Sequence, residues 1–175
     1  MEYFNKTSED WRISQCCQFH DKAKAKSYNF GTTTKTYALK EGGKERVQQK
    51  ALHNCNQLLS VLKNHFPTQP KNLRAWRISS ELFPCYTLDF TKPWYEEIWD
   101  DICAILEECG RLAKKHEVRL SVHPGQYTVL ASNKAEVVEN SIKDLEYHAL
   151  YGSLMGLPAK DFVMNIHLQG LCGGK

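Results

Sequence analysis

The stretch VRLSVHPGQYTVL, residues 118–130, predicts both the type of fold and the position of the functional residues. Apolar and polar residues alternate over 118–123, as they do in a strand that buries one of its faces. The apolar face holds Val118, Leu120 and Val122, and the opposite face holds Arg119, Ser121 and His123. Pro124 and Gly125 then end the strand and force a turn. This turn presents Gln126 and Tyr127 beside the strand end that carries His123.

Segments with the period of strands alternate with longer segments with the period of helices. The expected strands are 11–17, 75–79, 118–123 and 162–168, and the expected helices are 43–66, 93–116 and a third that runs to about residue 155. Asn133 and Glu136 have the spacing of a capping box that opens the third helix. This order is typical of a parallel sheet with helical crossovers. We therefore expect an α/β fold, a (β/α) TIM barrel of which the chain covers about the first four βα units.

The composition indicates one globular domain over residues 1–175. The chain is 42% hydrophobic, yet it has no apolar run of about 18 residues, which argues against a transmembrane helix. Its first residues lack the layout of a signal peptide. The seven cysteines show no CxxC spacing and are interpreted as reduced thiols. These features favour a cytoplasmic protein, or one in the cytoplasm of a host if a virus encodes it.

The charge is unevenly distributed along the chain. Residues 21–50 hold eight Lys or Arg and three acidic residues, so this segment is +5 in a chain of net charge +3. Residues 20–42 are expected to form a long loop between the first strand and the first helix. A basic loop rich in Thr and Gly can contact phosphates, and it can equally be a solvated surface loop.

Two histidines occupy corresponding places in the expected barrel. By strand parity His123 and His167 both face the barrel interior at matching carboxyl ends of neighbouring strands, where the active sites of this fold lie. Converging imidazoles suit Zn, Mn or Fe, whereas a single such histidine is more often a hydrogen-bonded core residue. The remaining histidines are predicted to be surface residues: His20, His53, His65, His116 and His148.

The pair Gln126 and Tyr127 has three interpretations. In an enzyme acting on sugars or other small molecules, the pair lines a pocket. In a DNA enzyme, the ring can wedge into the duplex while the amide replaces base-pair hydrogen bonds. Alternatively, Tyr127 packs under its own loop.

The string HPGQYTVL at 123–130 resembles the signature of the UV damage endonuclease family of the UvdE type. Other segments are similar to that family in the same order: CCQFHD at 16–21, YNFGTTTKTYAL at 28–39, WRISSELFP at 76–84, EVVENSIKDLEYHA at 136–149 and VMNIHLQG at 163–170. The resemblance covers nearly the whole chain.

The resemblance implies a TIM barrel that holds divalent metal ions, commonly manganese, with magnesium, zinc and cobalt as alternatives. It implies hydrolysis of a phosphodiester immediately 5′ to a UV photoproduct in double-stranded DNA, by a metal-activated water rather than by a side-chain nucleophile. His123 and His167 would be metal ligands, and Gln126 and Tyr127 would probe the damaged dinucleotide. The candidates for phosphate contacts are Lys22, Lys24, Thr32, Thr33 and Lys35.

The sequence departs from the family pattern in two ways. Leu88 stands where the family usually places a histidine ligand, and Asp89 is one residue further along. The 175 residues are also fewer than the roughly 250 of a full barrel. We therefore expect the N-terminal half of such an enzyme, completed by a C-terminal half or by a second polypeptide. The alternatives are a sugar-isomerase-like metal barrel and a non-catalytic, DNA-binding remnant of the family.

Overall fold

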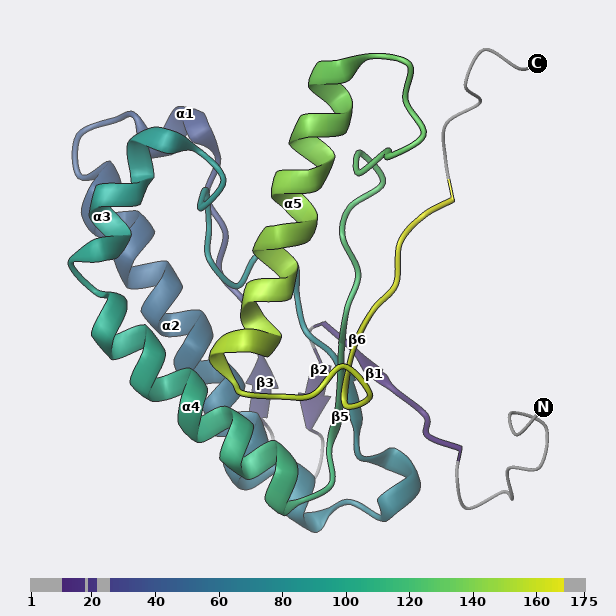
Figure 1. Cartoon of the computed structure of the whole chain (residues 1–175). Helices are drawn as coiled ribbons and strands as arrows, with labels where there is room; N and C mark the ends of the chain where they lie inside the picture. The colour runs from purple at the N-terminus through teal and green to yellow at the C-terminus, as the bar shows by residue number, and fades with distance from the viewer. Residues whose placement is uncertain (1–10, 18, 22–25, 169–175) are drawn as a thin grey trace.

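A four-stranded parallel sheet forms the centre of the computed structural model, which describes residues 11–17, 19–21 and 26–168. The strands are β1 (Gln15–Cys16), β4 (Ala75–Arg77), β5 (Arg119–Val122) and β6 (Phe162–Met164), and they lie side by side in that order. All three pairings are parallel. The expected α/β class with a parallel sheet is confirmed (Figure 1).

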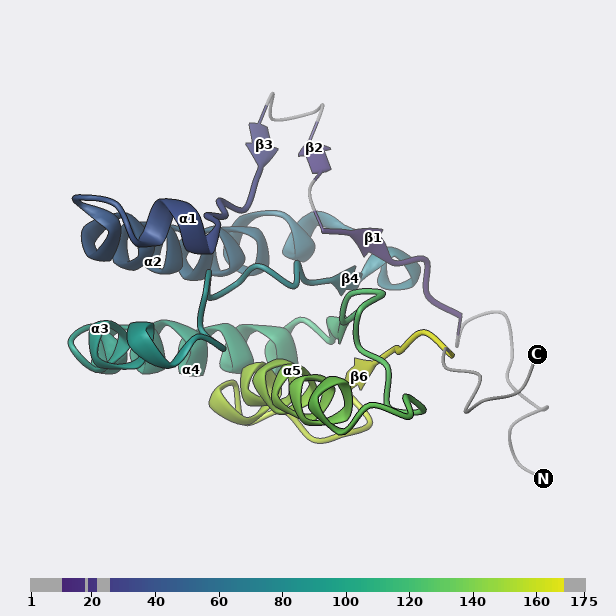
Figure 2. The same ribbon diagram turned by 90° about the horizontal axis from the view of Figure 1, so that it is seen from above.

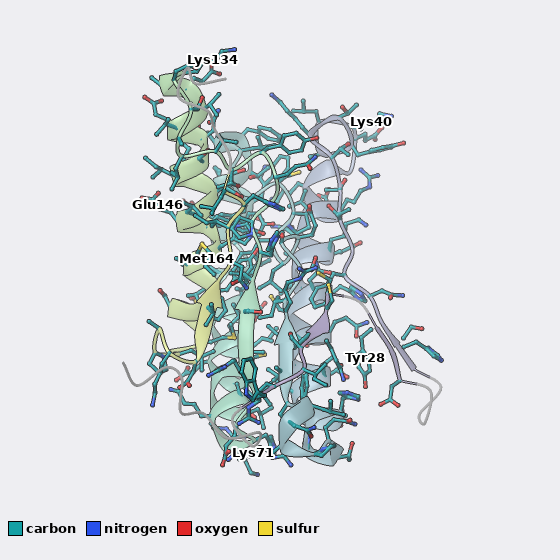
Figure 3. All side chains as sticks on the ribbon, turned by 90° about the vertical axis from the view of Figure 1, so that its right-hand side faces the viewer. Tyr28, Lys40, Lys71, Lys134, Glu146 and Met164 are labelled. Atoms are coloured by element: carbon teal, nitrogen blue, oxygen red, sulfur yellow. The ribbon has the colours of Figure 1, made fainter. Side chains whose placement is uncertain are left out.

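Long helices connect these strands and cover one face of the sheet. They are α2 (Gly43–Asn64), α4 (Trp99–Lys115) and α5 (Ala135–Leu154). Viewed from above, the helices stand on one side of the strands, and no described helix covers the opposite face (Figure 2). Figure 3 looks onto that uncovered face, with Met164 marking the last residue of β6.

The register places alternate residues on the two faces as expected. Gln15, Trp76, Leu120 and Phe162 are paired in one row across the sheet. Trp76 and Leu120 are fully buried in the core against the helices. The next row, Cys16, Arg77, Ser121 and Val163, is on the uncovered face. The predicted burial of the apolar face of β5 is therefore confirmed.

Several predicted boundaries differ from the structure. The helix expected over 93–116 is two helices, α3 (Lys92–Glu96) and α4, which meet at Glu97 and Ile98. The capping box at Asn133 is wrong: Lys134 is the N-cap of α5, and no side chain caps that helix end. The strands are shorter than predicted. The ladder of β6, for example, ends at Met164.

The expected long loop at 20–42 contains regular structure. An antiparallel hairpin joins β2 (Phe19–Asp21) to β3 (Lys26–Tyr28), and α1 (Lys35–Ala38) follows. A buried contact holds the hairpin to the end of α2, because His65 Nδ1 lies 2.8 Å from Asp21 Oδ2. The prediction that residues 20–42 form a long loop is therefore wrong. The prediction that His65 is a surface residue is also wrong. Short 3-10 turns at Phe66–Thr68, Lys71–Leu73 and Asp89–Thr91 complete the described elements.

The described cysteines are free thiols: Cys16, Cys17, Cys55, Cys85, Cys103 and Cys109. Within the described parts of the chain, no helix has the length and apolar character needed to cross a membrane.

Candidate functional site

The carboxyl ends of β5 and β6 bring His123 and His167 into direct contact. The ring centroids are 4.4 Å apart and the ring planes make an angle of 84°. Their positions are not matched in register, because Val122 pairs with Met164 and His123 therefore lies level with Asn165. That part of the prediction is wrong, because His167 lies beyond the ladder, which ends at Met164.

His123 lies in an environment that favours the neutral imidazole. Burial lowers the pKa of His123, and the nearby positive charges of His167 and Arg77 lower it further. The strand end is also fixed, because Ser80 Oγ donates a hydrogen bond of 2.8 Å to the carbonyl oxygen of His123. A neutral imidazole is the form that binds a metal ion.

The two imidazoles fit part of the coordination shell of a divalent ion. Among the described residues, no group of three or more His, Cys, Asp or Glu side chains is arranged to hold a metal. Any remaining ligands would therefore be water or groups outside this part of the chain. Imidazole nitrogens suit transition metals better than they suit magnesium or calcium.

Leu88 and Asp89 do not contribute to this pair of histidines. They lie at the start of a 3-10 turn and not on a strand. The Asp89 carboxylate forms an ion pair of 2.9 Å with Lys92, and this contact lowers its pKa. Asp89 lines a surface groove beside Lys143 and Glu146 of α5.

The turn after β5 exposes Gln126 and Tyr127 to solvent. The side chain of Tyr127 is 84% exposed, which excludes the interpretation that it packs under its own loop. Helix α5 holds the end of this turn: Thr128 Oγ1 donates to the Asp144 carboxylate, and the backbone N–H of Val129 donates to Ser141 Oγ over 2.7 Å. The ring is therefore exposed on an anchored turn.

Two buried tyrosines of α5 hold the loop that follows β4. The hydroxyl of Tyr147 accepts from the backbone N–H of Phe83 over 2.9 Å, and it lies 3.0 Å from the carbonyl oxygen of Ser80. The hydroxyl of Tyr151 donates to that same carbonyl over 3.1 Å. Because Ser80 also contacts His123, α5 positions both loops at this end of the sheet. This role of Tyr147 and Tyr151 was not predicted. The signal for it in the sequence is the presence of polar residues on the buried side of α5.

Buried Asn54 of α2 joins two loops in the same region. Its side chain accepts from the backbone N–H of Gly31 over 2.7 Å and donates to the carbonyls of Gly31 and Glu81 over 2.8 and 2.7 Å. This polar side chain is fully buried and was not predicted as functional. The sequence does contain a signal for this role, because Asn54 is a polar residue on the apolar side of α2.

The phosphate candidates have different surroundings. Thr32 Oγ1 donates to the carboxylate of Glu81 over 2.6 Å, so its hydroxyl already has an acceptor. Thr33 is half-buried, and Lys35 is exposed at the start of α1. Lys22 and Lys24 lie outside the described residues.

Arg77 adds a positive charge to the uncovered face of the sheet. Its Nη2 donates to Cys16 Sγ on the neighbouring strand, and its charge acts on His123. The alternation around Trp76 and Ile78 is enough to predict that Arg77 lies on the face opposite to theirs. Arg77 was nevertheless not predicted as a site residue.

Comparison with known proteins gives one consistent family. Residues 15–175 match the model of the family described as UV-endonuclease UvdE. The chain is 37% identical over 154 residues to the UV DNA damage endonuclease of Nostoc sp., covering 86% of this chain and 45% of that protein. It is 36% identical to the UV-damage endonuclease of Schizosaccharomyces pombe, covering 82% of this chain and 23% of the relative.

A solved structure resembles the fold as well. The crystal structure of SacUVDE superposes with a TM-score of 0.70 at 28% identity, covering 90% of this chain and 49% of that one. The chain thus spans about half, or less, of the length of the relatives that it matches.

Proposed function

The chain belongs to the UV-endonuclease UvdE family, and on that premise we propose that it forms the N-terminal half of a TIM-barrel endonuclease that repairs UV-damaged DNA. The proposed reaction is metal-dependent hydrolysis of the DNA backbone on the 5′ side of a UV photoproduct. The observation that carries this proposal is the contact between His123 and His167 at neighbouring strand ends, beside the exposed Tyr127.

The sheet supports the proposed barrel. Helices cover one face, while the other face presents the row of Cys16, Arg77, Ser121 and Val163. In a TIM barrel the side chains on the inner faces of eight strands pack against one another in the barrel interior. Closing the sheet would require further strands beside β1 and β6, which are its two edges.

His123 and His167 are the proposed protein ligands of the metal. A bound divalent ion supplies activation of water and neutralisation of charge on the phosphate. We propose manganese as the ion, with magnesium, zinc or cobalt as alternatives. The role of the chain itself is to hold the two imidazoles close together and to favour the neutral form of His123, whose pKa is lowered by burial.

Gln126 and Tyr127 are the proposed probes of the damaged dinucleotide. A wedging residue has to be exposed and held by a rigid support, and the contacts of Thr128 and Val129 with α5 provide that support. Phosphate contacts would position the DNA without reading its sequence, and the proposed residues are Lys22, Lys24, Thr32, Thr33 and Lys35.

The ligand assignment can be tested on a completed domain, in which this chain is joined to the remaining part of the Nostoc relative. Bound manganese and nicking of UV-irradiated plasmid are measured for the parent and for His123→Ala and His167→Ala. We expect each variant to lose at least about tenfold in metal affinity, because even the outer partners of metal ligands are worth that much. His53→Ala on α2, an exposed histidine, is the control. Unchanged metal affinity in both variants would refute the assignment.

A further inference from the structure

A cavity of about 340 Å³ lies between the loop after β4, the turn after β5 and helix α5. Its lining includes the carboxylates of Glu81 and Asp144, the imidazole of His148, and the rings of Tyr86 and Tyr127. Among the residues that the structure describes, the lining contains no lysine and no arginine. In a chain with a net charge of +3, this is therefore a site of negative potential.

Several hydroxyl groups around this cavity already have partners. Thr128 donates to one oxygen of Asp144, and Ser141 Oγ donates to the carbonyl oxygen of Val137 over 2.7 Å. The hydroxyl of Tyr147 is engaged with the backbone of Phe83. Thr32 likewise occupies one oxygen of Glu81. The second oxygen of each carboxylate can still accept a hydrogen bond.

His148 adds an unpartnered acceptor to this set. The side chain is 1% exposed, contrary to the predicted surface position, and its Nδ1 lies 2.7 Å from the carbonyl oxygen of Asp144. A carbonyl only accepts, so Nδ1 carries a proton, and in the form of the ring protonated on Nδ1 alone Nε2 presents a lone pair. Among the described residues Nε2 has no hydrogen-bonding partner. Because a buried polar atom without a partner is costly, this nitrogen points to a ligand with an N–H donor.

We propose that this cavity binds a small organic cation, namely a primary ammonium or guanidinium group on a short carbon chain. Its N–H groups would donate to the carboxylates of Glu81 and Asp144 and to Nε2 of His148. The ring of Tyr127 lies in the lining and is 84% exposed, so it can supply an aromatic face that attracts such a cation. A phosphate would meet two carboxylates and no positive side chain. A metal ion is disfavoured, since the described residues hold no group of three side chains placed to bind one.

This inference does not depend on the proposed endonuclease function, because no catalytic step enters it. The cavity is also separate from the uncovered face of the sheet, since its lining comes from two loops and α5. Self-association of the chain through that face would leave the cavity accessible.

Equilibrium dialysis of the whole chain against labelled methylguanidinium tests the proposal, because dialysis is valid for any oligomeric state. Glu81→Gln and Asp144→Asn remove a charge but keep an oxygen that accepts from Thr32 or Thr128. His148→Phe keeps a ring but removes the acceptor. We expect each variant to lose about tenfold in affinity, the usual scale of one hydrogen bond to a charged group. Glu139→Gln, an exposed position on the same helix, should change the affinity by less than about twofold.

Five competing probes distinguish the chemistry of the ligand. Urea has N–H donors without charge, and tetramethylammonium has charge without N–H donors; both should compete much more weakly than ethylammonium. Inorganic phosphate should not compete. Saturable binding of methylguanidinium that weakens in all three variants would support the proposal. Absence of binding, equal binding of tetramethylammonium, or binding of 2′-deoxyguanosine in place of the cations would overturn it.

Discussion

Tyr127 carries an apolar ring that is 84% exposed at the end of an anchored turn. The fold leaves this ring accessible for a contact with another molecule. Stacking on a nucleobase would bury the ring and leave the hydroxyl at the edge of the contact.

Tyr127→Ala is expected to weaken binding to UV-damaged duplex by roughly 1–3 kcal/mol, which is the scale of one base–aromatic stack. Binding to undamaged duplex should change much less, because an intact stack offers no place for a wedge. Tyr127→Phe keeps the ring and should retain most of the affinity. Fluorescence anisotropy with matched damaged and undamaged duplexes measures both values. Equal losses on the two DNAs would instead indicate a non-specific contact.

At the scale of single residues, strand parity predicted burial well and hydrogen-bonded partners poorly. Leu120 and Val122 are fully buried as expected, because period-two alternation is a local property of the sequence. His65 and His148 were predicted at the surface and are buried. Each has a partner that is invisible in its own pattern: Asp21, distant in the sequence, for His65, and the helix carbonyl of Asp144 for His148.

At the scale of elements, α2 and α5 act as supports for the loops at the carboxyl end of the sheet. Asn54 of α2 joins the loops at Gly31 and Glu81, and Tyr147 of α5 holds the loop at Ser80 and Phe83. The helices therefore transmit their rigidity to the segments that carry the candidate site.

Asn54→Ala is expected to lower the free energy of unfolding by about 1–3 kcal/mol, because it leaves backbone groups of Gly31 and Glu81 without their partners. Asn56→Ala is the matched control on the same helix. Asn56 is exposed and donates only to Leu52 one turn earlier, so its loss should cost less than about 0.5 kcal/mol. Urea unfolding at a fixed protein concentration gives both values. Similar costs for the two variants would contradict the role of Asn54.

Gly110 allows α4 to approach α5 closely. A Cβ at this position would lie 1.8 Å from the carbonyl oxygen of Met155, which follows α5. In a helix with free space, Gly→Ala stabilises by roughly 1 kcal/mol through helix propensity. We expect the opposite sign for Gly110→Ala, a net destabilisation of about 1–3 kcal/mol from overpacking. Thermal unfolding of this variant would disprove the close approach if its midpoint rose.

The order of elements was largely predictable, whereas their ends and the hairpin were not. The amphipathic faces of α2 and α4 were predicted from their spacing, and the buried residues confirm them. The hairpin of β2 and β3 was missed because its strands are three residues each, too short for a periodic signal. The contact of His123 with His167 was expected, but the register predicted for it was wrong. The length of a ladder depends on how two strands pair, and it cannot be read from one strand alone.

At the scale of the whole molecule, the sheet is covered on one face only. Exposed apolar side chains lie on the edge strand β6 and on the segments that flank the two edge strands: Val163 on β6, Trp11 and Ile13 before β1, and Ile166 and Leu168 after β6. Edge strands with unpaired backbone groups and apolar neighbours are templates for association. In the proposed barrel these surfaces would contact further strands. The same features that support the barrel therefore make the isolated chain prone to self-association.

We therefore expect the 175-residue chain alone to self-associate and to leave UV-irradiated plasmid intact in the presence of manganese. Light scattering after size-exclusion chromatography measures the association. Ile166→Lys adds a charge beside the edge strand β6 and should weaken the association several-fold by like-charge repulsion. Ile142→Lys places the same charge at a similarly exposed position on α5, away from the sheet, and should have little effect. Catalysis should fail for a separate reason, because His123 and His167 alone leave most of the coordination of a metal to water. A monomeric chain that nicks irradiated plasmid faster than untreated plasmid would show that these residues already contain a complete site.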